Sequence, residues 1–168
     1  AGMGENKSNI YKTVLISEEQ KSKWISAGGD PNKSVIIPVP VEVPNYGLES
    51  YIKEFGWEDK FVFGMHQRDD IHIFSPVPLE AYDEIQSEDT AFLILGGSAN
   101  HRKQAKDYQL KNVKFLDTTS DISLIHKFLN TLDVYAHGRS DGEQCSSAII
   151  EGLSHSLPMI SHTAVSMG

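Results

Sequence analysis

The fold is decided by residues 133–161, which read DVYAHGRSDGEQCSSAIIEGLSHSLPMIS. The stretch begins with the apolar run DVYAH, which predicts a short buried strand, and continues into loop 138–142, whose glycines and aspartate suit neither strand nor helix. Ser146 and Ser147 are preferred helix N-caps, and apolar residues recur after them at helical spacing. Residues 157–161 predict a second strand. A loop therefore leads from a strand into a helix N-terminus, the arrangement with which α/β proteins bind anions.

Upstream of this unit, apolar runs that predict strands are separated by segments that predict helices. The strands are expected at 61–65, 91–95 and 113–116. The helices are expected at 78–85, 99–110 and 122–132. The strands show no strict polar alternation, so both faces of the sheet must be covered. The sequence therefore predicts an α/β fold with a doubly wound parallel sheet of the Rossmann-like type.

The loops that follow the predicted strands are the candidate binding segments, because ligands of open α/β sheets bind beyond the carboxyl ends of the strands. These loops are residues 64–70, 96–100, 117–120 and 137–147. The sequence has no P-loop, no G-x-G-x-x-G fingerprint, no H-E-x-x-H motif and no cysteine cluster, so we expect no metal site. His66 and His72 flank residues 67–70 without a third metal ligand, and the glycines at the start of the second loop suit either a tight turn or a ligand.

Composition and charge place the chain among ordinary globular proteins. It has 168 residues, of which 39% are hydrophobic and 23% are charged. The net charge of -8 argues against binding to nucleic acid or to an anionic membrane surface. No apolar run reaches the roughly 18 residues of a membrane span. The one cysteine, Cys145, fits a reducing compartment, so we expect a cytoplasmic protein.

A proline-rich connector divides the chain. A strand, helix and strand are expected within residues 13–37, and Ser17 is the candidate cap of the helix. Three prolines within residues 38–47 exclude a regular sheet there and predict a stiff, extended segment. We therefore expect residues 1–47 to be the end of a first domain with its crossover, and residues 48–168 to be a second domain.

Two acids in the deciding stretch, Glu143 and Glu151, suit ligand binding for different reasons. Glu143 precedes the capped turn, so its carboxylate lies in the loop, where it can accept hydrogen bonds from the hydroxyls of a ligand. Glu151 falls within the helix, near the apolar stripe, where a carboxylate needs a partner. A solvated Glu151 at the edge of the helix and a Glu151 with a functional role are both open.

The same stretch resembles the sugar-nucleotide signature of the retaining glycosyltransferases of family four. In that family the segment typically reads E-G-F-G-x-x-x-x-E-A-x-x-x-G-x-P-V-I. Here residues 143–152 read EQCSSAIIEG and residues 157–160 read LPMI. The run NVKFL at 112–116, the pair DV at 133–134 and residues 12–38 are similar to further parts of the family pattern. The resemblance extends over nearly the whole chain.

The resemblance implies a GT-B architecture, in which two Rossmann-like domains form the enzyme and the second binds a nucleotide-diphosphate sugar. This chain would be that donor-binding domain, truncated at its C-terminus, with a short piece of the missing N-terminal acceptor domain. The implied function is transfer of the sugar to a glycan, lipid or small-molecule acceptor with retention, without a metal or other cofactor. The fragment alone is expected to be inactive. Peripheral membrane contact through the missing domain stays open.

The resemblance also assigns roles to individual residues. Glu143 would bind the hydroxyls of the donor sugar, and Glu151 would bind the ribose of the nucleotide. Glu143 and Arg68 are the catalytic candidates, Arg68 as a cation for the diphosphate. The other donor-binding candidates lie in the loops and at the helix N-terminus, where backbone N–H groups can face the diphosphate. They are Gly64, Gly96, Gly97, Cys145, Ser146 and Ser147.

The cations are where the chain departs from the family. The family normally supplies an arginine and a lysine after the strand equivalent to residues 61–65, and Arg68 is the candidate arginine. The other interpretation of Arg68 is a surface side chain paired with a neighbouring aspartate, Asp69 or Asp70. No lysine occurs between Lys60 and Lys103, so the second cation is missing from this region.

Three other functions stay open. A non-catalytic module that binds a nucleotide sugar or phosphate is favoured by the missing lysine. A UDP-sugar epimerase-like enzyme of the same architecture would need acid–base side chains in the loops. A flavodoxin-like interaction domain would bind no ligand at all.

Overall fold

The computed structural model describes residues 11–40, 47–139 and 146–161. The first part contains two strands, a helix and a short 3-10 helix: β1 (Thr13–Leu15), α1 (Glu18–Ser26), η2 (Pro31–Lys33) and β2 (Ser34–Ile36). β1 and β2 pair in parallel. Ser17 caps α1 as predicted, since its Oγ accepts a hydrogen bond from the backbone N–H of Gln20 at 3.1 Å. The domain boundary expected at residue 47 stays a prediction, because residues 41–46 lie outside the described ranges.

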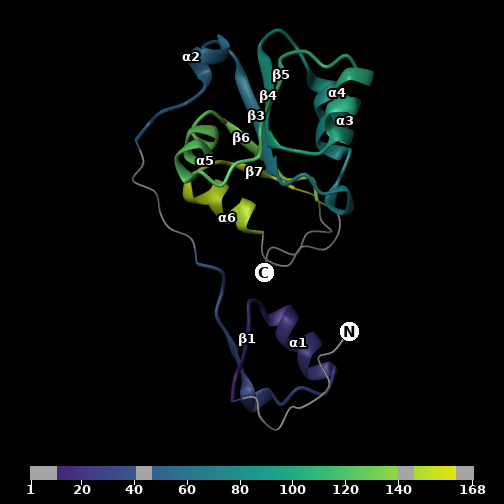
Figure 1. The fold of residues 1–168 in the computed structure, drawn as a ribbon, viewed down its shortest axis with the longest axis vertical. Coiled ribbons are helices and arrows are strands. Elements are labelled where there is room, and N and C mark those ends of the chain that lie inside the picture. Colours follow the sequence, from purple (N-terminus) through teal and green to yellow (C-terminus); the bar gives the residue numbers. More distant parts are fainter. Residues whose placement is uncertain (1–10, 41–46, 140–145, 162–168) are drawn as a thin grey trace.

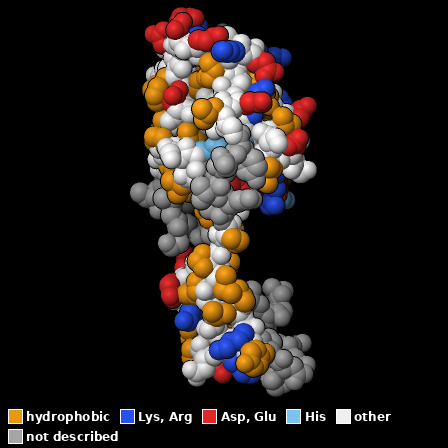
Figure 2. Space-filling view, turned by 90° about the vertical axis from the view of Figure 1, so that its left-hand side faces the viewer, with side chains coloured by type: hydrophobic (Ala, Val, Ile, Leu, Met, Phe, Trp, Pro, Cys, Tyr) orange, Lys and Arg blue, Asp and Glu red, His pale blue; other side chains and the backbone are white. Residues whose placement is uncertain are grey.

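Apolar side chains are exposed along this first part of the chain. No residue of α1 is buried, and Val14, Val35 and Ile37 are all exposed. Figure 2 shows the hydrophobic side chains gathered along the narrow lower part of the molecule, which β1, α1 and β2 form. The pair of strands therefore leaves apolar surface uncovered within the described residues.

The described residues from 47 onward form a five-stranded parallel sheet with the order β5–β4–β3–β6–β7. Its strands are β3 (Phe61–Gln67), β4 (Thr90–Gly96), β5 (Val113–Leu116), β6 (Val134–Ala136) and β7 (Met159–Ile160). Its helices are α2 (Ile52–Phe55), η3 (Ile71–Ile73), α3 (Val77–Ile85), α4 (Ala99–Asp107), α5 (Ile122–Leu129) and α6 (Ser147–Ser154). Figure 1 shows α3 and α4 on one side of the sheet and α5 and α6 on the other. The predicted doubly wound sheet is confirmed.

The order of the strands reverses at β3. The chain first moves outward from β3 to β4 and β5, and it then returns to place β6 on the opposite side of β3. In an open α/β sheet such a reversal opens a crevice beyond the carboxyl ends of the two strands that flank it, and ligands bind there. The place for a ligand is therefore beyond Gln67 and Ala136, where β3 and β6 end.

The core is made by apolar side chains of the central strands and of the helices that cover them. Val62 on β3, Leu93 and Ile94 on β4, and Phe128 and Leu129 on α5 are completely buried. Burial of one such side chain is worth about 1.5–3 kcal/mol, so these contacts dominate the stability of the sheet. None of the helices in the described ranges has the length and the apolar character needed to cross a bilayer.

Helix α2 lies in a stretch, residues 47–60, whose polar composition predicted no regular element. Its flanking residues Tyr51 and Trp57 are nevertheless buried. The partners of α2 lie on and just after α5. The backbone N–H of Tyr51 donates to Oγ1 of Thr131 at 2.8 Å, and Nζ of Lys127 lies 4.1 Å from the centroid of the Tyr51 ring. These partners are distant in the sequence, so local periodicity could not reveal the helix.

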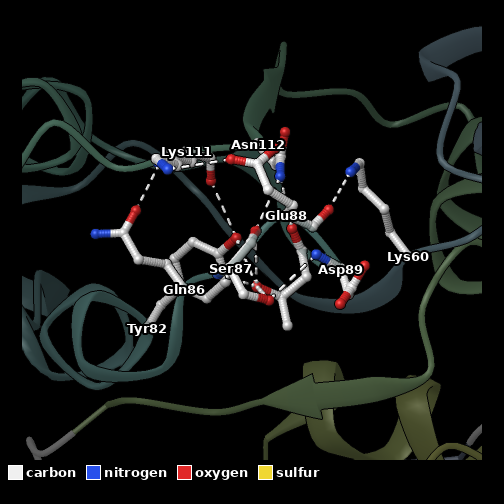
Figure 3. Close-up of polar contacts among 9 residues, drawn as sticks. Lys60, Tyr82, Gln86, Ser87, Glu88, Asp89, Lys111 and Asn112 are labelled. Atoms are coloured by element: carbon white, nitrogen blue, oxygen red, sulfur yellow. Dashed lines mark hydrogen bonds and ion pairs between the residues drawn. The ribbon is translucent and has the colours of Figure 1, made fainter.

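The loop between α3 and β4 is tied to the start of β5 at the end of the sheet opposite the crevice (Figure 3). The hydroxyl of Tyr82 donates to the carbonyl of Lys111 at 3.0 Å, and the backbone N–H of Lys111 donates to Oε1 of Gln86 at 2.8 Å. Nδ2 of Asn112 donates to the carbonyl of Thr90 at 3.0 Å. These bonds hold β4 and β5 in register at their amino-terminal ends, so the loops at their carboxyl ends are not needed for this alignment.

Helices α5 and α6 are joined by a pair of histidines. Nδ1 of His126 lies 2.6 Å from Nε2 of His155, and Nδ1 of His155 lies 2.9 Å from Oδ1 of Asn130. An amide oxygen only accepts, so Nδ1 of His155 carries the proton and its Nε2 accepts from His126. Burial lowers the pKa of His155 from its ordinary value, the neighbouring His126 lowers it further, and Glu151 opposes both. The hydrogen bonds and the burial of His155 therefore both favour its neutral form.

We predict that the free energy of unfolding falls as the pH drops below about 6.5, because the unfolded chain then binds more protons than the folded chain. His155→Gln should make this pH slope shallower in urea unfolding between neutral and mildly acidic pH. His101, whose pKa burial also lowers, keeps part of the slope in the variant. His72→Gln, at an exposed position, is the control and should keep the slope of the parent protein. Equal slopes in the two variants would contradict the assignment.

Candidate functional site

A cavity of about 540 Å³ opens at the reversal of the strand order. Its walls come from the carboxyl ends of β3 and β6, from the first turns of α6, and from α5. The polar side chains on its walls include His66, Gln67, Arg68, His137, Arg139, Ser146 and Glu151. A volume of this size is within the range of small-molecule and cofactor sites. The crevice that the topology predicts is therefore present.

The N-terminus of α6 forms one wall of the cavity. Ser146 is its N-cap, with Oγ accepting from the backbone N–H of Ile149 at 3.4 Å, as the sequence predicted. Ser147 is the first residue of the helix and also lines the cavity. Free backbone N–H groups and the helix dipole favour an anion at such a terminus. This wall can hold a phosphate without any particular side chain.

Glu151 forms the second feature of the site, and it has a partner that the sequence did not reveal. Its Oε2 lies 2.7 Å from Nε2 of His66, which follows Met65 on β3. The Glu151 side chain is 37% exposed and the His66 side chain 15%. Glu151 is thus neither a buried unpaired acid nor a freely solvated one, because one carboxylate oxygen is bound and the carboxylate still lines the cavity.

Two arginines lie at the cavity. The side chain of Arg68 is 71% exposed, and its guanidinium lies 3.4 Å from a carboxylate oxygen of Asp70. The expected ion pair therefore exists, although Arg68 also lines the cavity. An exposed pair of this kind contributes about 0–1 kcal/mol, which leaves Arg68 able to exchange Asp70 for an anionic ligand. Arg139 follows β6 and lines the same cavity. The second cation at the cavity is therefore an arginine that follows β6, whereas the family pattern places a lysine after the strand equivalent to β3.

The predicted glycines have clear structural roles away from the cavity wall. Gly64 is buried inside β3, where an added Cβ would lie 2.5 Å from Cδ2 of Leu132 and 2.6 Å from the carbonyl oxygen of Leu93. Gly96 and Gly97 have φ values of 80° and 75°, a backbone conformation that residues other than glycine disfavour. A part for these three in donor binding stays a prediction.

The remaining candidates divide into two groups. Glu143 and Cys145 lie outside the described residues, so their positions relative to the cavity stay predictions. The loops 96–100 and 117–120 follow β4 and β5, and none of their residues lines the cavity described above. Among the residues that the structure describes, no group of three or more histidine, cysteine or acidic side chains is arranged to hold a metal ion.

The histidines were the signal that sequence reasoning left unused. In the sequence His66 stands out only as half of a histidine pair with His72, and His72 is exposed and does not line the cavity. His137 ends the β6 run in the sequence and is buried at the cavity, with Nε2 3.4 Å from Oγ of Ser146. Each of the two strands at the reversal has a histidine at its carboxyl end, His66 on β3 and His137 directly after β6. This shared position at the carboxyl ends is the sequence signal that indicates both residues.

Comparison with known proteins finds similarity at the level of structure alone. No family model matches the sequence, and no curated protein matches it. HepE (Alr3699) of Anabaena, solved in complex with UDP and glucose, superposes with a TM-score of 0.75 at 17% identity over 92% of this chain and 45% of its own. The fold is that of one Rossmann-like half of a GT-B glycosyltransferase.

Two further GT-B structures show the same relationship. A glycosyltransferase of Rickettsia africae has a TM-score of 0.76 at 18% identity, covering 94% of this chain and 45% of its own. WaaG, a glycosyltransferase involved in lipopolysaccharide biosynthesis, has a TM-score of 0.72 at 14% identity with the same coverage. The chain thus spans less than half the length of these proteins.

We predict that Gly96→Ala destabilises the protein by about 2–4 kcal/mol, because the new Cβ adds overpacking to the strain of a left-handed backbone. That Cβ would lie 2.3 Å from the carbonyl oxygen of Gln67, which accepts from the backbone N–H of Gly97. Gly56→Ala is the matched control, since φ is +65° there and nothing lies within 4 Å of the added atom. Urea unfolding should show a clearly larger loss for position 96. Equal losses of unfolding free energy in the two variants would contradict the predicted overpacking at position 96 and would attribute the whole loss to backbone strain.

Proposed function

We propose that this chain supplies the donor site of a glycosyltransferase that transfers a sugar from a nucleoside diphosphate with retention, as the family-four signature implies. One observation carries the proposal: a single cavity at the strand-order reversal combines a helix N-terminus, two arginines and a carboxylate. A nucleoside diphosphate sugar presents two phosphates and several hydroxyls, which these groups bind. The fold of HepE, which was solved with UDP and glucose, supports the same ligand class.

Each group has a distinct part in the proposed complex. The diphosphate lies at the N-terminus of α6, where the first-turn N–H groups donate to its oxygens. Arg68 on the β3 side and Arg139 on the β6 side balance its charge. Glu151 accepts hydrogen bonds from the ribose hydroxyls, and Glu143, in the segment between β6 and α6, accepts them from the sugar.

The chemical step follows from the charge that develops. The bond between the anomeric carbon and the diphosphate oxygen breaks, and the departing nucleoside diphosphate takes the electron pair. Helix N–H groups that are already oriented stabilise this charge at little reorganisation cost, and the two arginines add positive charge beside it. An acceptor hydroxyl attacks the same face of the sugar and gives its proton to the departing phosphate, which yields retention. The acceptor is bound by the rest of the enzyme, so the chain alone is proposed to bind donor without transferring it.

The first test is calorimetric titration of the 168-residue chain with UDP, GDP and their sugars. We predict binding by at least one of them and a loss of about tenfold to a hundredfold in Glu151→Gln, the scale of hydrogen bonds to a charged acceptor. Glu84→Gln, on the exposed surface of α3, is the matched control and should bind like the parent. Binding by none of the ligands at millimolar concentration would overturn the proposal.

A second test separates the phosphate cations from the nucleoside contacts. Arg139→Gln should weaken UDP binding by about fivefold or more, because a charge-assisted contact to phosphate is lost, and it should leave uridine binding unchanged. Arg102→Gln is the control and should bind both ligands like the parent, since Arg102 lies on α4 over the ring of Phe115 and does not line the cavity. An equal loss for UDP and uridine would show that Arg139 supports the fold and not the diphosphate.

A further inference from the structure

His66 is held from several directions at the wall of the cavity. Nδ1 of its ring lies 3.0 Å from the hydroxyl of Tyr135, and the same hydroxyl lies 3.2 Å from the backbone N and 3.3 Å from the carbonyl oxygen of His66. The rings of Tyr135 and Phe128 meet the imidazole edge-on, with centroids 5.4 Å and 5.7 Å away. Tyr135 and Phe128 are completely buried, so they hold the imidazole in one orientation.

The orientation of the ring directs one N–H at Glu151. The carboxylate of Glu151 only accepts, so Nε2 of His66 carries a proton and donates to Oε2 at 2.7 Å. Nδ1 and the carbonyl oxygen of His66 both lie within hydrogen-bond distance of the Tyr135 hydroxyl, which accepts from the backbone N–H of His66. A carboxylate has about four acceptor sites, so Glu151 keeps acceptor sites for a ligand after this bond is made. The three side chains come from β3, β6 and α6 and thus span the reversal.

We propose that His66 is the positioning residue of the nucleotide site: oriented by Tyr135, it holds the Glu151 carboxylate as an acceptor for the ribose hydroxyls. This inference rests on the donor-binding function proposed above and names the residue that makes its ribose contact selective. A free glutamate on a helix samples several rotamers, and ordering it on binding reduces affinity. The bond to His66 places the carboxylate before the nucleotide arrives, in the manner of outer-shell partners at other sites.

The test compares UDP with 2′-deoxy-UDP by calorimetric titration of the full 168-residue chain. The parent should prefer UDP, because the 2′-hydroxyl donates to Glu151. His66→Leu should lose about tenfold in UDP affinity, the scale of one hydrogen bond to a charged group, and most of the preference over the deoxy ligand. His66→Gln keeps an amide N–H near the place of Nε2 and should retain the preference. Tyr135→Phe should show an intermediate loss.

Controls make the outcomes distinguishable. His72→Leu, exposed in the same region of the chain, should leave both affinities unchanged. In a Glu151→Gln background His66→Leu should add little, since both changes remove one interaction. A parent that binds UDP while His66→Leu retains the UDP preference overturns the role of His66 alone. A parent that binds none of UDP, GDP and their sugars overturns the donor site and this inference together, and a parent that binds GDP alone is tested with GDP and 2′-deoxy-GDP in the same way. If His66→Leu does not fold, the UDP preference of Tyr135→Phe is compared with that of His66→Gln. A smaller preference in Tyr135→Phe supports the role of His66, and equal preferences overturn it.

Discussion

The pairing of β6 with β3 is the interaction on which the rest of the structure depends. It begins at Asp133, whose backbone N–H donates to the carbonyl of Val62 at 2.8 Å and whose carboxylate accepts from the N–H of Val62 at 2.7 Å. The register then sets Phe63 beside Val134 and Gly64 beside Tyr135. Because β6 lies on the other side of β3 from β4, the segments that follow β3 and β6 lead to helices on opposite faces of the sheet and leave the crevice between them.

The same register places polar side chains of separate elements together. Tyr135 on β6 reaches the backbone and the ring of His66 on β3, and His66 in turn reaches Glu151 on α6. Gly152 lets α6 approach the sheet, since an added Cβ would lie 3.1 Å from Sδ of Met159. The same position faces the ring of Tyr135 at 3.4 Å, so the helix carrying Glu151 lies close against the strand residues that surround His66. The packing of α6 against the sheet therefore also sets the distance between Glu151 and His66.

Several elements could be predicted from sequence because their signals are local. The apolar run 91–95 identified β4, and Ser17 and Ser146 identified the starts of α1 and α6. Helix α2 could not be predicted, because its buried aromatic residues are held by α5 and not by its own periodicity. The expected ends of α4 and α5 were too late by a few residues, since each helix is followed by a hydrogen-bonded turn that carries another apolar residue, Leu110 or Leu132. Glu151 was recognised as needing a partner, yet His66 is distant in the chain.

The sequence by itself determined the strands of the sheet, the helices between them and the capped start of α6, though not α2, because periodicity, capping and residue type act over a few neighbouring positions. It also indicated a parallel sheet, since continuous apolar strands require cover on both faces. Only the tertiary structure decided that Arg139 joins Arg68 at one cavity and that His66 binds Glu151. These contacts cross the reversal of the strand order, and side chains on different strands meet only where the pairing and register of the sheet put them.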